Sequence, residues 1–301
     1  MSDEARALER LLAGSALAGR PVSCFALPRS GEHVLAVKTD PAALIAEWSV
    51  ACGLLDQTGR WPVASTSWST RGTELRDWSF WMDPRGEKQP PPLARQAATS
   101  LSGVEALAAI GAARRPDEPL DELLEFHLDA TRRRCGDAPD PATVRAALAP
   151  DATEADLDGW LLAWEETRTP TAGPEHADVD DWYYPEPEYD ETYLLFLPTR
   201  VGPDALAYIE FNAEDGVAGA TTERLIAVLS SWHERYGAQL VAHWGTMLQF
   251  AVSRPPQSLD DAWELAGEHE LIAPGTDPTT VRRDCARWLW QRPTWFLHER
   301  P

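Results

Sequence analysis

His233 and His243 lie ten residues apart and have the clearest potential in this chain for acid–base chemistry or metal binding. Both occur in the stretch WHERYGAQLVAHWG (232–245). The four-residue spacing of Trp232 and Tyr236 predicts a helix that ends at the following glycine, with a strand after it. Neither an H-E-x-x-H motif nor a cluster of carboxylates surrounds the histidines. The stretch is therefore interpreted as a helix–turn–strand junction with structural histidines.

An unrecognised enzyme or small-ligand binder is the alternative interpretation of these residues. Its cleft would lie between two α/β units of the chain and would involve Glu210, His233, Tyr236 and His243. The sequence has no dinucleotide-binding fingerprint, no P-loop and no nucleophile elbow. We therefore predict no cofactor and no catalytic residues.

A second candidate site is an acidic segment, residues 151–191, which contains fourteen acids and one base, Arg168. Its prolines predict an extended or irregular backbone. Aromatic side chains among the acids favour a recognition surface, because tyrosine and tryptophan are common at the centres of protein interfaces. The candidate binding residues are Asp178, Asp180, Asp181, Trp182, Tyr183, Tyr184, Glu186, Glu188 and Tyr189. A solvated acidic linker is the alternative, and a metal site is not predicted because calcium-loop spacing is absent.

The net charge of −21 restricts the possible partners. So negative a surface repels nucleic-acid phosphate and anionic lipid, and it attracts a basic protein. The four cysteines lie far apart, without zinc or redox spacing. No apolar run reaches the ~20 residues of a membrane helix, and the N-terminus does not resemble a signal peptide. We expect a cytoplasmic protein; its oligomeric state stays open.

Hydrophobic periodicity predicts an α/β or α+β fold with two small mixed-sheet units and flanking helices. The N-terminal unit, 1–83, has expected strands at 22–27, 33–38 and 61–66, with a helix over 40–59. The C-terminal unit, 192–301, repeats this order with strands at 192–198 and 205–211 and a helix that ends at Gly237. A helical, acidic middle segment, 84–191, joins them. Whether the units form one sheet or two domains stays open.

Further signals mark the remaining elements. Asp140-Pro141 and the pair Thr153 and Asp156 predict helix starts in the middle segment. Ser258 is the expected N-cap of a later helix, and Gly245-Thr246 is the expected turn of a hairpin. A last helix should start at Asp277-Pro278, and TWFLHE (294–299) should be the final strand.

Several separated motifs resemble a bacterial domain-of-unknown-function family, number 4253. They are RLIAVLSSWHERYGAQLVA, SRPPQSLDDAWELAGEHE and the tryptophan-rich end, over roughly residues 160–301, with TGRWPV (58–63) upstream. The chain departs from the family's pattern at Ala273-Pro274-Gly275, where a Cys-Pro-Asp segment is expected, and at its final residues. The resemblance implies no activity.

Together these features predict a non-catalytic interaction protein that binds a basic partner through its acidic aromatic segment. An immunity or antitoxin-like role is one concrete form, because complementary charge accelerates the capture of a basic effector.

Overall fold

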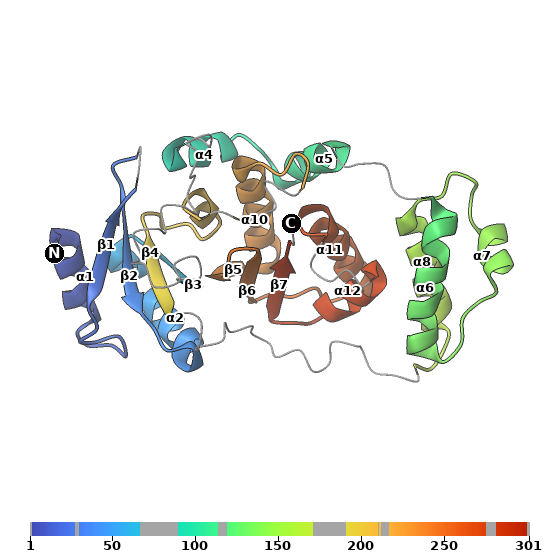
Figure 1. The fold of residues 1–301 in the computed structure, drawn as a ribbon, viewed down its shortest axis with the longest axis horizontal. Coiled ribbons are helices and arrows are strands. Elements are labelled where there is room, and N and C mark those ends of the chain that lie inside the picture. The colour runs from blue at the N-terminus through green and yellow to red at the C-terminus, as the bar shows by residue number, and fades with distance from the viewer. Residues whose placement is uncertain are drawn as a thin grey trace.

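The computed structural model shows a mixed α/β protein in which one seven-stranded sheet carries helices, and a separate group of helices lies at one end (Figure 1). The structure describes residues 2–27, 30–66, 90–113, 119–170, 191–209, 211, 217–274 and 281–299. None of the described helices is both long enough and apolar enough to cross a bilayer.

The N-terminal unit forms much as its sequence patterns predict. Ser2 caps α1, and Asp40 accepts a hydrogen bond from the amide of Ala42 at the start of the next helical turn. The expected single helix over 40–59 is divided into a 3-10 turn and two α-helices, and Gly59 ends it with a φ of 65°. The elements are α1 (Asp3–Leu12), β1 (Val22–Ala26), β2 (His33–Lys38), η1 (Pro41–Ala43), α2 (Leu44–Gly53), α3 (Leu55–Thr58) and β3 (Trp61–Thr66).

The described C-terminal part supplies four strands and two long helices, of 15 and 14 residues. The hairpin at Gly245-Thr246 and the Ser258 cap are confirmed, since Trp244 bonds to Met247 and Ser258 accepts from Asp261. The start expected at Asp277-Pro278 lies outside the described residues. The elements are β4 (Thr192–Leu197), η4 (Pro203–Ala207), α10 (Thr222–Tyr236), β5 (Ala238–His243), β6 (Met247–Val252), α11 (Leu259–Ile272), α12 (Arg282–Leu289) and β7 (Thr294–His298).

The strand expected at 205–211 is wrong. Residues 203–207 form the 3-10 helix η4, and Pro203 stands at its first turn, where its fixed φ favours a helical start. Ala205, Leu206 and Tyr208 are all buried. A short run that is buried on every side has no period that distinguishes a strand from a helix.

The sheet joins both units directly, in the order β1-β2-β4-β3-β5-β6-β7. Strand β4 of the C-terminal part lies between β2 and β3 of the N-terminal part and is antiparallel to both. Among the described strand pairs, only β3 and β5 are parallel, with Ala64 opposite Ala242. The question of one sheet or two is therefore settled in favour of one.

The main hydrophobic core lies between the sheet and helix α10. Trp232 on α10 packs edge-on against Phe250 and Trp295 of the sheet, with ring centroids 6.1 and 6.0 Å apart. The predicted shared face of Trp232 and Tyr236 is confirmed, since both are buried together with Leu225, Ile226 and Leu229. Helices α4 (Pro91–Ala98) and α5 (Gly103–Ala113) also contribute to this core.

A second, separate core belongs to α6 (Leu120–Cys135), α7 (Pro141–Ala147) and α8 (Glu154–Glu166), which we call the helical unit. In Figure 1 these green helices lie at the opposite end of the molecule from α1. Their small core contains Leu124, Leu128, Val144, Leu157 and Leu161. The helical unit therefore has the organisation of a small module beside the α/β body.

Candidate functional site

The helical unit is fixed locally by its caps. Asp140 accepts hydrogen bonds from the amides of Ala142 and Thr143 at the start of α7. At the start of α8, Thr153 and Asp156 form the predicted capping box. The hydrogen bonds from Thr153 lower the pKa of Asp156. These caps define where α7 and α8 begin, and so they position the residues between them.

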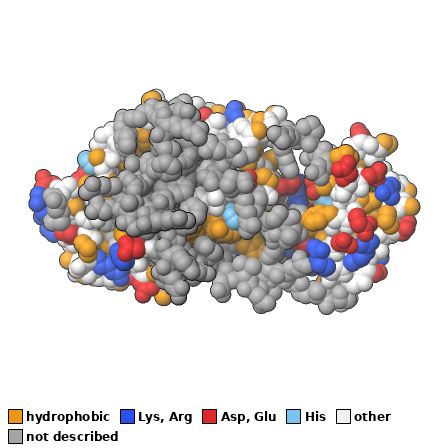
Figure 2. Space-filling view, in the orientation of Figure 1, with side chains coloured by type: hydrophobic (Ala, Val, Ile, Leu, Met, Phe, Trp, Pro, Cys, Tyr) orange, Lys and Arg blue, Asp and Glu red, His pale blue; other side chains and the backbone are white. Residues whose placement is uncertain are grey.

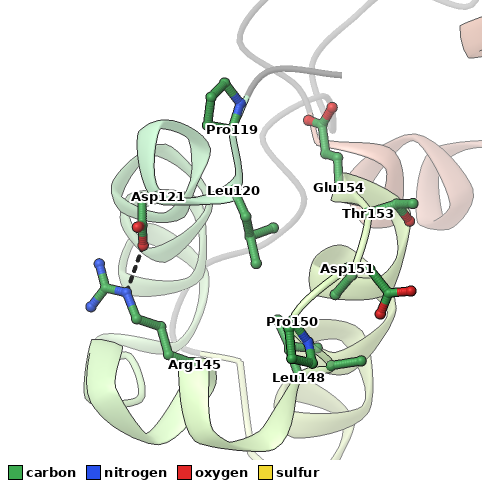
Figure 3. A pocket seen from close by; sticks show the side chains of 11 residues that line it. Pro119, Leu120, Asp121, Arg145, Leu148, Pro150, Asp151, Thr153 and Glu154 are labelled. Carbon is green, nitrogen blue, oxygen red and sulfur yellow. Dashed lines mark hydrogen bonds and ion pairs between the residues drawn. The ribbon is translucent and has the colours of Figure 1, made fainter. Parts of the chain in front are cut away.

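A pocket of about 660 Å³ opens where the helices of this unit begin and end (Figure 3). It is lined by the first turn of α6, the residues after α7 and the start of α8. Its apolar side chains include Leu120, Leu148 and Pro150, and the two leucines also pack against the helical unit's core. The pocket therefore offers both hydrocarbon surface and access from solvent.

Three carboxylates and one guanidinium line this pocket, namely those of Asp121, Asp151, Glu154 and Arg145. Arg145 Nε lies 2.7 Å from Asp121 Oδ1, so this cation is already paired. Figure 3 shows Glu154 and Asp151 on the side of the pocket opposite that pair. The charge left over is negative, which suits a cationic group with an aliphatic stem, such as lysine or arginine.

Behind Glu154 lies a buried histidine, His127 of α6. Its Nε2 is 3.0 Å from Glu154 Oε1, and its Nδ1 is 2.9 Å from Asp158 Oδ1. Only 1% of the His127 side chain is exposed, whereas 29% of Glu154 is. When both ring nitrogens carry protons, each donates to one carboxylate. The histidine thus connects the pocket wall with the interior of the unit.

Asp158 continues this chain of contacts to Arg283, which belongs to α12 of the α/β body. Arg283 is fully buried, pairs with Asp158, and donates from its backbone N–H to Asp158 Oδ2 at 2.7 Å. Its other nitrogens donate to Glu165 Oε1 at 2.8 Å, Thr131 Oγ1 at 2.9 Å and the carbonyl of His127 at 2.8 Å. One side chain of the body thereby contacts two helices of the helical unit.

Burial sets the electrostatics of this network. It lowers the pKa of Arg283 to about 10, which still leaves the guanidinium charged at neutral pH. Burial also raises the pKa of Glu165. The positive charge of Arg287 opposes this increase, since the two side chains form an ion pair at 2.7 Å that lacks hydrogen-bond geometry. Removal of one member of such a buried network typically costs about 3–5 kcal/mol, because its partners stay buried without compensation.

The residues predicted from the sequence are distributed differently. All nine candidate interaction residues, from Asp178 to Tyr189, lie outside the described residues, as does Glu210. Their proposed roles therefore stay predictions. The described end of the acidic segment, from Asp151 to Glu166, contributes to the pocket and to the buried network.

The other cleft candidates occupy defined places in the α/β body. His233 Nδ1 lies 3.0 Å from the carbonyl of Ala238, the first residue of β5. His243 is the last residue of the same strand and is buried. At the usual rise per residue it lies about 16 Å along the strand from Ala238. The hydroxyl of Tyr236 donates to Asp261 at 2.7 Å, and burial raises the pKa of this tyrosine well above its usual range. The two histidines are therefore not brought together.

Sequence reasoning missed His127, Asp158 and Arg283. His127 and Asp158 are 31 residues apart, and Arg283 is 125 residues or more from both, so no local motif contains them. The sequence did contain one signal that acids of α8 are buried. Asp158 and Glu165 fall on the same helical stripe as the apolar Leu157 and Leu161. Within the described part of the chain, no group of three or more metal-ligating side chains could hold a metal ion.

Comparison with known proteins identifies part of the chain. Residues 193–298 match the family model of a domain of unknown function, DUF4253. This confirms the resemblance of the C-terminal part. The match includes α12 with Arg283, whereas the helical unit and its pocket lie outside it. No curated protein and no solved structure matches the chain.

Proposed function

We propose that this protein is a non-catalytic interaction module that binds a basic protein, and that its pocket receives a lysine or arginine side chain of that partner. The observation that carries the proposal is the pocket lining. Asp151 and Glu154 supply negative charge opposite the pair formed by Asp121 and Arg145. Leu120 and Leu148 supply apolar surface for the aliphatic stem of the partner's side chain.

The arrangement of the protein's own cations supports this proposal. Acidic and basic side chains are interspersed over the end of the molecule that holds the helical unit (Figure 2). Arg132 pairs with Glu125 and Asp129, and Lys38 pairs with Glu191. The opposite charges of such pairs cancel locally. The net charge of −21 therefore comes from the acids that outnumber the bases. That excess would attract a basic partner over distances up to the Debye length.

The acidic aromatic residues 178–189 are the second proposed contact region. They follow the helical unit in the chain, and the acidic segment starts at Asp151 in the pocket itself. We propose that a basic partner contacts both the pocket and this segment. Inhibition of a basic effector, as an immunity or antitoxin protein performs it, is the role we favour, and we place it in the cytoplasm.

Capture of partners from host lysate at low and high salt, followed by mass spectrometry, is the first test. A basic protein that is retained at low salt and released at high salt is the expected result. Its purified form should then bind Asp151→Lys at least about tenfold more weakly than the wild type, because the reversed charge repels the incoming cation.

Glu234→Lys provides the matched control. Glu234 is exposed near the end of α10, and the substitution makes the same change in net charge outside the pocket. A loss of affinity confined to Asp151→Lys would support the pocket as the contact site. Equal losses in both variants would show that only overall charge matters and would refute a specific role for the pocket.

A further inference from the structure

The helical unit and the α/β body have separate hydrophobic cores, and charged groups dominate the described contacts between them. Arg283 and Arg287 of α12 reach Asp158 and Glu165 of α8. An apolar contact adds to these ion pairs, because Trp263 of α11 packs beside Gly159. Buried ion pairs are demanding in geometry and lose much of their energy when one partner moves. This interface is therefore suited to open as a unit.

The same network reaches the pocket through one histidine. Glu154 on the pocket wall contacts His127, which contacts Asp158, and Asp158 binds Arg283. A cation that enters the pocket and draws Glu154 to itself competes with His127 for this carboxylate. The competition would remove one of the two carboxylates that orient the His127 ring. The ring's other nitrogen, Nδ1, lies 2.9 Å from Asp158 Oδ1 and 3.2 Å from Arg283 Nη1, so a change in the ring's position reaches the arginine directly.

We propose, on the basis of the function proposed for the pocket, that the contacts of Arg283 are a latch between the helical unit and the α/β body, and that occupation of the pocket by a basic side chain loosens it through Glu154 and His127. Binding of the basic partner thus regulates whether the helical unit stays docked. By thermodynamic reciprocity, a protein with an opened latch binds the basic group more tightly by the same factor.

Cys135 provides a local reporter of this latch. It is the last residue of α6 and is buried, and the nearby charges of Glu165, Arg134 and Arg287 act on its thiol. Opening of the interface would expose it to a thiol reagent. In a chain that retains only Cys135, with Cys24→Ser, Cys52→Ala and Cys285→Ala, the labelling rate measures the opening. A second chain that retains only Cys52, on α2, reports on the α/β body.

Arg283→Met tests the latch itself. This variant should accelerate labelling of Cys135 at least about a hundredfold, because the buried Asp158 loses its guanidinium partner and Glu165 keeps only its contacts with other arginines. It should leave labelling of Cys52 unchanged. If it does not fold, Arg283→Lys replaces it, with a smaller acceleration expected because lysine cannot form the same fork of contacts. Equal acceleration at Cys52, or none at Cys135, would overturn the latch.

Glu154→Gln tests the connection without a ligand. It removes the charge that His127 faces and should accelerate Cys135 labelling about tenfold, the cost of replacing a hydrogen bond to a charged group by one to a neutral amide oxygen. Asp151→Asn is the matched control, since it neutralises another acid of the same pocket and should leave the labelling rate unchanged. If Glu154→Gln also leaves the rate unchanged, the connection is refuted.

A hexa-arginine peptide, with hexa-citrulline as its uncharged control, then tests the effect of occupation. Saturating hexa-arginine should accelerate labelling in the chain that retains only Cys135, and should not do so when His127→Gln is added to that chain. Binding without acceleration would overturn the coupling and leave the proposed function intact. If hexa-arginine does not bind while Glu154→Gln still opens the latch, the proposed function fails and the internal connection stands.

Discussion

The buried imidazole of His269 on α11 should make the stability of this protein depend on pH. The side chain is 2% exposed and lies between two tryptophans, with ring centroids 4.6 Å from Trp232 and 5.6 Å from Trp295. Within the described part of the chain, neither ring nitrogen has a hydrogen-bond partner. Burial lowers the pKa of His269 from 6.5 to about 3. The folded protein therefore holds this ring neutral at any pH above that value.

The sign of the effect follows from proton binding. Below pH 6.5 the unfolded chain takes up a proton at His269, whereas the folded chain does not until about pH 3. Stability is therefore complete above pH 6.5 and falls as the pH drops through this window. Each pH unit below 6.5 costs about 1.4 kcal/mol of the free energy of unfolding. Only the last unit between pH 8 and pH 5.5 lies in that range, so the total loss is about 1.4 kcal/mol. The lower limit stays above the isoelectric point of about 4.7, near which a low net charge promotes association.

Urea unfolding of the wild type and of His269→Leu at both pH values measures this effect. Leucine has a similar volume; it removes two unsatisfied nitrogens but also loses the ring contacts, and these changes nearly offset each other at pH 8. The stability of the wild type relative to the variant should fall by about 1.4 kcal/mol at pH 5.5. Other titrating groups cancel in this comparison.

A non-titrating change on the same helix is the control. Ile272→Val truncates another fully buried side chain of α11 and should cost about 1 kcal/mol equally at both pH values. If His269→Leu shows the same pH dependence as the wild type, the imidazole is either hydrated or partnered in solution. The interpretation of a dry, neutral histidine would then be wrong.

Three backbone predictions can be measured by the same unfolding assay. Gln291 has a φ of 62°, so Gln291→Gly should stabilise the protein by about 0.5–1 kcal/mol as left-handed strain is removed; a loss of stability would contradict this. Gly159→Ala should stabilise by up to about 1 kcal/mol, because the new methyl group would lie an ordinary 3.6 Å from Trp263 within a helix. Gly202→Ala should instead cost about 1–3 kcal/mol, because its methyl group would lie 2.8 Å from the buried ring of Trp61. Equal effects of the two alanines would refute this use of the packing distances.

Local signals predicted most elements of the fold. The caps at Asp140, Thr153 and Ser258 depend on hydrogen bonds between residues no more than three positions apart, and all three form where the sequence predicted them. The order of the sheet was beyond prediction, because the placement of β4 between β2 and β3 depends on contacts between distant residues. The error at 205–211 has the same origin, since burial beneath α10 overrode the preference of the segment for strand.

In the candidate site, too, local features were predictable from the sequence and long-range contacts were not. The caps that shape the pocket were predicted, but the pocket arises from three helices whose packing no short pattern records. Arg283 could not be assigned a role, because its partners are 118 to 156 residues away. Asp158 and Glu165 were grouped with the other acids of residues 151–191, although their position on the apolar stripe of α8 indicates burial.

The charge of the acidic segment must accordingly be divided between folding and recognition. From the sequence, residues 151–191 carry a net charge of −13. Among its described residues, Asp158, Glu165, Glu166 and Glu191 each pair with an arginine or lysine outside the segment, so part of that charge serves the fold and not a partner. Neutralisation of Asp158 should therefore weaken the docking of the helical unit, whereas neutralisation of Asp151 should weaken partner capture. A mutational scan that treats all acids of the segment as equivalent would mix these two effects.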